Sequence, residues 1–195
     1  MWQELDLGVC SARYWARDDK RVVVVLPGAG YLPGYPLLWF ARKAAVACDW
    51  SVVELWYEWT PAEGDPARFV DARLEAALAR VTSADQILLV GKSLGSLAAS
   101  AAARANFPAI WITPLLRNHQ VVEAIIRTTA RRLLVGGTAD EAWASDAVVK
   151  AREGDAVVVA ISGGDHALEV SDDLPATLAA LTTVTQSIAA FIAEL

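Results

Sequence analysis

A short stretch in the middle of the chain, Gln86–Ser100, carries the residues with the clearest chemical potential. Its sequence is QILLVGKSLGSLAAS, in which four apolar residues lead directly into Gly91-Lys92-Ser93. If this is the end of a phosphate-binding loop, Lys92 and Ser93 grip a nucleotide. If it is a G-x-S-x-G nucleophile elbow, Ser93 is an attacking nucleophile. The two hypotheses describe different proteins.

The phosphate-binding hypothesis fails on spacing. A Walker A loop follows the pattern G-x-x-x-x-G-K-[ST], which requires a glycine five positions before Gly91. Gln86 occupies that position, and the four residues between them (ILLV) have the composition of a strand. No flexible loop is left to wrap a phosphate.

The elbow pattern fits at each position. A sharp turn between a strand and a helix crowds the residues two places before and after the nucleophile, and Gly91 and Gly95 occupy those places. Ser93 is then expected at a helix N-terminus, where free N–H groups favour negative charge. The plain alternative is an N-cap serine with no catalytic role.

The elements around this stretch alternate between apolar runs and helical patterns. Strands are predicted at Val22–Leu26, Ser51–Tyr57, Ile87–Val90, Ala109–Ile112, Leu133–Val135 and Val157–Ile161. Helices are predicted at Leu37–Cys48, Ser93–Ala105, Val121–Ile126 and Glu141–Lys150. Two more are predicted from apolar stripes: one opened by the loop TPAEGDPAR, with its stripe from Val70 to Val81, and the last helix, with its stripe from Leu174 to Leu195. Such alternation favours parallel pairing with crossover helices on both faces. We therefore expect one α/β domain over residues 1–195, a three-layer sandwich with a mostly parallel twisted sheet and antiparallel edge strands from residues 1–20.

Composition limits the classes of partner. The net charge of −6 argues against a nucleic-acid partner. No apolar run approaches the roughly 20 residues that cross a bilayer, and the start MWQELDLGVCSARYW lacks the pattern of a signal peptide. A cytoplasmic protein without a membrane partner is expected. Cys10 and Cys48 have no neighbouring Cys or His, which predicts free, partly buried thiols rather than a disulfide or a zinc site.

With its G-x-S-x-G placed between a strand and a helix in this topology, the chain resembles the α/β-hydrolase superfamily over residues 20–195. It is most similar to small members without a lid, such as dienelactone-hydrolase-like esterases. The resemblance implies a triad in the chain order serine, acid, histidine. It implies no metal and no organic cofactor.

The histidine implied by the resemblance is His166. The chain has two histidines, and His166 lies in ISGGDHALEV between the last strand and the last helix, where the superfamily places its catalytic base. A neutral imidazole there can take the serine proton and return it to the leaving group. An exposed loop histidine without a role is the alternative. His119, at the start of a predicted helix, is expected on the surface.

The acid implied by the resemblance follows the penultimate strand. Asp140 comes after the Gly136-Gly137 turn in RRLLVGGTADEAW, and it would fix the tautomer of His166 and stabilise its imidazolium. A helix cap is the alternative role for Asp140, and Glu141 and Asp146 are substitute acids. Asp165 is adjacent to His166 and would have difficulty folding back onto that ring.

An oxyanion hole requires two backbone N–H groups aimed at the developing charge. The resemblance implies the N–H of Leu94, directly after the nucleophile, and the N–H of Ala29 in the loop after the first parallel strand. That loop is Pro27-Gly28-Ala29-Gly30, where relatives often carry His-Gly-x-Gly. Pro27 therefore replaces the usual histidine, and the anchoring of the loop is open.

These features together predict a serine hydrolase that cleaves a carboxylic ester, or else a thioester or amide, of a small soluble substrate through an acyl-enzyme. One alternative is a dinucleotide-binding protein that uses Gly28, Gly30 and Gly34, with Glu54 on a ribose. Another is a hydrolase-fold binding protein without catalysis.

Other side chains near the expected site give weaker indications. Lys92 is expected to be exposed to solvent beside the site, without an assigned role. Tyr31 and Glu58 are candidate substrate contacts, and four tryptophans near strand ends give a weak indication of a pocket: Trp39, Trp56, Trp59 and Trp143.

Overall fold

The computed structural model describes all 195 residues and is built on one eight-stranded sheet. Its strand order is β1-β2-β4-β3-β5-β6-β7-β8. The bounds are β1 Gln3–Asp6, β2 Ser11–Trp15, β3 Asp18–Leu26, β4 Trp50–Trp56, β5 Gln86–Lys92, β6 Ala109–Ile112, β7 Arg132–Gly137 and β8 Val157–Ile161. Strands β3 to β8 pair in parallel, while β1 and β2 form the antiparallel edge that was predicted for the first 20 residues.

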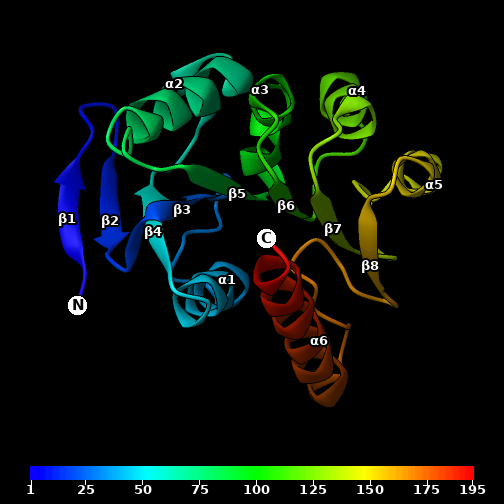
Figure 1. Ribbon diagram of the computed structural model, residues 1–195. Helices are drawn as coiled ribbons and strands as arrows, with labels where there is room; N and C mark the ends of the chain where they lie inside the picture. The colour runs from blue at the N-terminus through cyan, green and yellow to red at the C-terminus, as the bar shows by residue number, and fades with distance from the viewer.

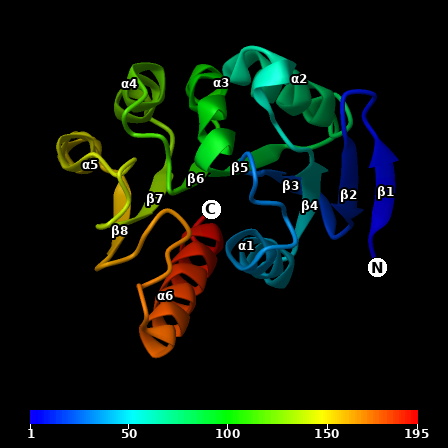
Figure 2. The same ribbon diagram turned by 180° about the vertical axis from the view of Figure 1, so that it is seen from behind.

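Helices cover both faces of the sheet (Figure 1). One face carries α1 (Pro36–Ala47) and α6 (Leu174–Ala193); the other carries α2 (Pro66–Leu78), α3 (Ala99–Ala105), α4 (His119–Arg127) and α5 (Ser145–Glu153). The reverse view shows the same three layers, with the β1 edge at one end of the sheet and β8 at the other (Figure 2). The predicted three-layer α/β sandwich is confirmed, and no inserted cap stands over the sheet.

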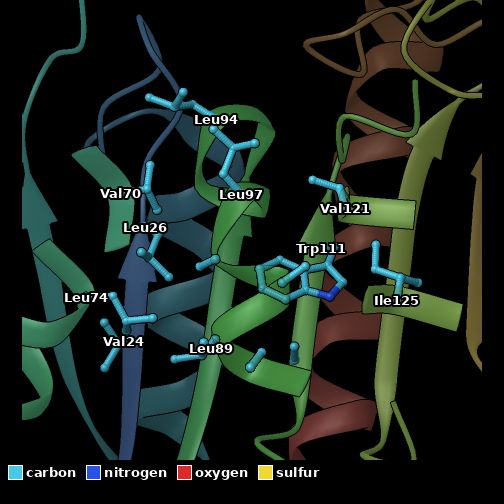
Figure 3. Packing of buried hydrophobic residues seen from close by; sticks show 14 of the residues in the cluster. Val24, Leu26, Val70, Leu74, Leu89, Leu94, Leu97, Trp111, Val121 and Ile125 are labelled. Carbon is cyan, nitrogen blue, oxygen red and sulfur yellow. The ribbon is translucent and has the colours of Figure 1, made fainter. Parts of the chain in front are cut away.

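Two apolar cores follow from the alternation of side chains along the strands. Val24, Leu26, Leu89 and Trp111 face the layer of α2, α3 and α4. Figure 3 shows them packed with residues of α2, of the 3-10 helix Ser93–Ala98 and of α4: Val70, Leu74, Leu94, Leu97, Val121 and Ile125. The intervening residues, such as Val23 and Val25 on β3, face α1 and α6. Because these central strands are buried on both faces, the sequence VVVVL is one continuous apolar run.

Two predicted helices begin differently in the structure. The segment predicted as one helix over Ser93–Ala105 starts as a 3-10 helix, η2 (Ser93–Ala98), before α3. Helix α5 begins four residues later than predicted because residues 140–143 form a turn, in which the N–H of Trp143 donates to the carbonyl of Asp140. Cys10 and Cys48 are free and half-buried, as predicted.

Helix α6 is long and apolar enough, by length and composition, to cross a membrane, which was not expected. The core helix of a soluble protein can have the same length and composition. In this fold α6 buries Ala180, Val184 and Ile188 in the core that it shares with α1 and the sheet.

The turn from β5 into η2 depends on glycine at two positions. A Cβ atom on Gly91 would lie 2.6 Å from the ring of Trp111, and one on Gly95 would lie 2.3 Å from the carbonyl oxygen of Leu26. A backbone oxygen cannot swing aside as a side chain can. Gly95 therefore allows η2 to pack directly on strand β3.

We expect Gly95→Ala to lower the free energy of unfolding by about 1–3 kcal/mol, because overpacking forces a backbone shift. The matched control is Gly30→Ala, since a Cβ there has no atom within 4 Å. Urea unfolding of both variants provides the measurement. A Gly95→Ala protein as stable as the Gly30→Ala control would contradict this account of the turn.

Candidate active site

Three predicted side chains lie in one hydrogen-bonded row at the carboxyl edge of the sheet. The Nε2 atom of His166 is 2.8 Å from the Oγ atom of Ser93, and its Nδ1 atom is 2.8 Å from Oδ2 of Asp140. Ser93 follows β5, Asp140 follows β7, and His166 follows β8. Parallel strands bring their carboxyl ends to the same edge, so residues 73 positions apart in sequence become neighbours.

Ser93 stands on a strained turn. Its φ angle is 50°, in the left-handed region that costs a non-glycine residue roughly 1–3 kcal/mol. The hydroxyl of Ser96 donates to the carbonyl of Ser93 at 2.6 Å and accepts the N–H of Leu115 at 3.1 Å. These two bonds hold the turn against the loop after β6 and leave the Ser93 hydroxyl free to face His166.

Asp140 is buried and its two carboxylate oxygens are used separately. Oδ1 accepts the N–H of Ala142 at 2.8 Å, while Oδ2 faces His166. The residue at the N-cap of α5 is Ala144, so capping is not the role that the structure gives Asp140. The substitute acids Glu141 and Asp146 are exposed on the surface.

The loop that carries His166 is bonded to the loop that carries Asp140. The N–H of Ala139 donates to the carbonyl of Gly164 at 2.9 Å, and the N–H of Gly163 donates to the hydroxyl of Thr138 at 2.8 Å. The side chain of Asp165 points away from the imidazole of His166, because its Oδ1 accepts hydrogen bonds from the backbone N–H groups of Ala167 and Glu169. These bonds hold the histidine loop against the aspartate loop. His119 is exposed on α4.

The loop after β3 passes beside Ser93. A Cβ atom on Gly28 would lie 3.5 Å from the Cβ of Ser93. Tyr57 donates its hydroxyl to the carbonyl of Pro27 at 3.3 Å, and the N–H of Gly28 donates to the carbonyl of Tyr31 at 3.2 Å. These two bonds anchor the loop in which Pro27 replaces the usual histidine. Burial raises the pKa of Tyr57, so its hydroxyl remains a donor.

The two predicted oxyanion donors have no hydrogen-bond acceptor within the protein. Neither the N–H of Ala29 nor that of Leu94 donates a hydrogen bond within the structure. Ala29 is exposed, and Leu94 is the second residue of η2, where the helix has no earlier carbonyl to offer. Leu94 directly follows Ser93, and Ala29 directly follows Gly28, whose backbone lies beside Ser93.

Lys92 is buried, so the expectation that it is exposed to solvent was wrong. Only 1% of its surface is accessible, and its Nζ donates to the carbonyl oxygen of His166 at 2.9 Å. The same ammonium lies 4.9 Å from the ring centre of Tyr31. Burial lowers the pKa of Lys92 to about 8, and the negative charges of Asp140 and Asp165 partly oppose that shift.

Two cavities lie near His166, one lined by His166 itself and the other by its neighbour Ala167. One of about 600 Å³ is lined by His166, Asp140 and Arg117 with their neighbours. The second, of about 410 Å³, has a mostly apolar wall that includes Tyr31 and Leu168. The four tryptophans that gave a weak indication of a pocket line neither cavity, and neither does Glu58.

The carboxylate that dinucleotide binding would require, that of Glu54, is already hydrogen-bonded within the protein. Glu54 is buried, with Oε1 accepting from Arg42 at 2.7 Å and Oε2 accepting from the indole of Trp15 at 2.9 Å. Neither oxygen is free for a ribose hydroxyl. No group of three or more His, Cys, Asp or Glu side chains is placed to hold a metal ion.

Comparisons with known proteins agree on the architecture. No protein-family model and no curated protein matches the chain. Among solved structures, a serine hydrolase homologue from Coxiella burnetii has a TM-score of 0.73 at 16% identity, covering 97% of this chain and 96% of its own. The chain has the α/β-hydrolase fold.

Two further neighbours share that fold over nearly their full length. Est1E from Butyrivibrio proteoclasticus, solved with ferulic acid bound, has a TM-score of 0.76 at 13% identity and 98% coverage of both chains. A serine hydrolase without a lid from Xanthomonas campestris has a TM-score of 0.72 at 16% identity, covering 100% of this chain and 94% of its own.

The buried ammonium of Lys92 predicts a pH-dependent stability. Its pKa is about 8 in the folded protein against an ordinary value of 10.5, so between these pH values the unfolded chain binds more protons. Stability contributed by this group therefore rises as the pH increases from 8 to 10.5 and is constant below 8. We expect wild type to gain up to ~3 kcal/mol relative to Lys92→Met across this interval, by urea unfolding.

The comparison with Lys92→Met cancels groups common to both proteins, such as Tyr57 and Cys10. Lys20→Met is the control, because Lys20 also donates to a backbone carbonyl, that of Ser83, but is exposed. A difference between wild type and Lys92→Met that stays constant from pH 7 to 10.5 would contradict the burial of a charged Lys92.

Proposed function

We propose that this protein is a serine hydrolase that cleaves a carboxylic ester of a small soluble substrate through an acyl-enzyme. The observation that carries the proposal is the continuous row from Ser93 Oγ through both ring nitrogens of His166 to Asp140 Oδ2, with 2.8 Å at each step. A nucleophile within hydrogen-bond distance of a base, itself oriented by a buried acid, is the arrangement used for acyl transfer.

In the first half-reaction, the Oγ of Ser93 attacks the carbonyl carbon of the ester while its proton passes to Nε2 of His166. Oδ2 of Asp140 accepts a hydrogen bond from the Nδ1–H group of His166 and its negative charge stabilises the imidazolium. The N–H groups of Ala29 and Leu94 bind the oxyanion. Collapse of the tetrahedral intermediate breaks the bond to the alcohol, which leaves with the proton from Nε2. Ser93 then carries the acyl group.

The second half-reaction returns the enzyme to its starting state. Water enters the place of the alcohol and gives one proton to Nε2 of His166 as its oxygen attacks the acyl carbon. Collapse of the second intermediate breaks the bond to Ser93, which recovers its proton from His166. A carboxylic acid is the second product. None of these steps requires a metal or an organic cofactor.

The structural neighbours support an ester as the substrate class ahead of a thioester or an amide. A further neighbour is the esterase domain of a Rhodothermus marinus protein, with a TM-score of 0.61. A non-catalytic binding protein would need no acid buried behind the imidazole. The bonded state of Glu54 likewise disfavours dinucleotide binding.

We expect Ser93→Ala and His166→Ala each to lower kcat for p-nitrophenyl butyrate by several orders of magnitude. The double variant should lower kcat little further than either single variant, because the losses of kcat are not additive when the residues act together in one mechanism. Asp140→Asn should reduce kcat less than Ser93→Ala does. His119→Ala removes the other histidine, which is exposed, and serves as the control with wild-type activity. Substantial turnover by Ser93→Ala would exclude the mechanism.

The absence of a cap predicts the preferred length of the acyl group. The connection from β6 to β7 holds only α4, and the connection from β4 to α2 holds only the short 3-10 helix Pro61–Glu63. Neither can enclose a long chain, and a methylene group contributes about 0.8 kcal/mol only where it is buried. We expect kcat/KM for p-nitrophenyl acetate and butyrate to equal or exceed that for the laurate. A steep rise towards the laurate would reveal an acyl tunnel and contradict this expectation.

A further inference from the structure

The side chain of Lys92 lies beneath the proposed site. Lys92 is the last residue of β5, directly before Ser93, and it points to the same face of the sheet as Leu88 and Val90. This is the face covered by α1 and α6 (Figure 1). The ammonium is thus enclosed between the sheet edge, the loop after β3 and the loop after β8.

The burial of Lys92 is not offset by an ion pair. No carboxylate lies within 4.0 Å of its Nζ, in contrast to the buried pair of Arg42 and Glu54. Removing an ammonium from water costs free energy, and an apolar side chain of similar volume usually fills such a place at no loss of stability. The contacts made by Lys92 are therefore better explained by what they do for the site than by stability.

Each contact of Lys92 belongs to a different part of the proposed site. Its ammonium binds the carbonyl oxygen of His166, the residue that faces the nucleophile. It also lies against the ring of Tyr31, whose own carbonyl accepts the N–H of Gly28 in the oxyanion loop. Its backbone continues directly into Ser93. One side chain thus joins the nucleophile strand, the oxyanion loop and the histidine loop.

We propose that Lys92 is a positioning residue whose ammonium holds the backbone of His166 and the ring of Tyr31 against the strand that carries Ser93. This proposal rests on the proposed hydrolase function. Lys92 does not touch the substrate; it keeps Nε2 of His166 within reach of Ser93. A charged donor binds a carbonyl more strongly than a neutral one, so the positive charge is part of the role.

The charge of Lys92 is set by the groups around it. Asp140 and Asp165 favour the ammonium, whereas burial opposes it and places the pKa at about 8. Tyr31 stays neutral in this range, since burial raises its pKa. The ammonium is consequently present below pH 8 and is lost as the pH rises through that value. The hold on His166 weakens in the same direction.

The test is steady-state hydrolysis of p-nitrophenyl butyrate by wild type, Lys92→Met and Lys20→Met. We expect Lys92→Met to lower kcat about tenfold or more with KM within about twofold of wild type, because small displacements of a catalytic group cost turnover rather than binding. Lys20→Met removes an exposed lysine that also donates to a backbone carbonyl, and it should match wild type. Circular dichroism establishes that each variant is folded.

The pH dependence of kcat shows whether Lys92 positions His166 through its charge or only fills space. Wild-type kcat should fall as the pH rises through about 8, whereas Lys92→Met should give a low kcat without that alkaline decrease. Lys92→Gln, which keeps a donor but no charge, serves as the second variant and should resemble Lys92→Met. A wild-type profile that is flat from pH 7 to 10 would overturn the proposal even if neither variant folds.

Failure of this proposal can be distinguished from failure of the proposed function. If wild type hydrolyses the ester and Lys92→Met shows the same kcat and the same pH profile, Lys92 has no positioning role and the hydrolase function stands. If wild type and Lys20→Met hydrolyse no ester at all, the hydrolase function fails, and the proposal for Lys92 fails with it.

Discussion

The left-handed turn at Ser93 is the constraint on which the rest of the site depends. With φ at 50°, the chain leaves strand β5 and enters η2 without an intervening loop, so the hydroxyl stands clear of the sheet edge. The turn closes only because Gly95 lies against the carbonyl of Leu26 at the end of β3. The same contact brings the loop after β3 beside Ser93. One backbone conformation therefore supplies both an accessible hydroxyl and a neighbouring N–H group.

Several residues at the carboxyl edge of the sheet lower the stability of the folded protein, and burial in the two apolar cores must offset this loss. These residues are Ser93 in its strained conformation, the buried Asp140, and Lys92, which is buried without an ion pair. All three lie around His166. Elsewhere a buried charge is paired with an opposite one, since the guanidinium of Arg42 lies 2.7 Å from a carboxylate oxygen of Glu54. Apolar layers on both faces of strands β3 and β5 compensate for this loss, and Figure 3 shows the layer that faces α2 and α4. Such a local departure from favourable design is expected where a protein functions.

Much of this could be predicted from sequence because the signals were local. Apolar runs predicted each parallel strand, and the spacing of Gly91, Ser93 and Gly95 predicted the turn. The interactions that were missed join distant residues or lack a pattern. Tyr57 anchors Pro27 from 30 positions away. Lys92 lies two residues beyond the predicted end of its strand at Val90, whereas β5 continues to Lys92 and places its side chain on a buried face. Helix α5 starts later than predicted because Asp140 and Trp143 form a turn before it. That turn holds Asp140 in the position where it faces His166.

The most direct test of the central claim is covalent labelling with a fluorophosphonate followed by peptide mapping. An activated serine attacks phosphorus as it attacks an acyl carbon and remains modified. We predict one modified residue, Ser93, in wild type, with labelling abolished in Ser93→Ala and strongly slowed in His166→Ala. A protein that remains unlabelled, or that carries the label on another residue, would contradict the account.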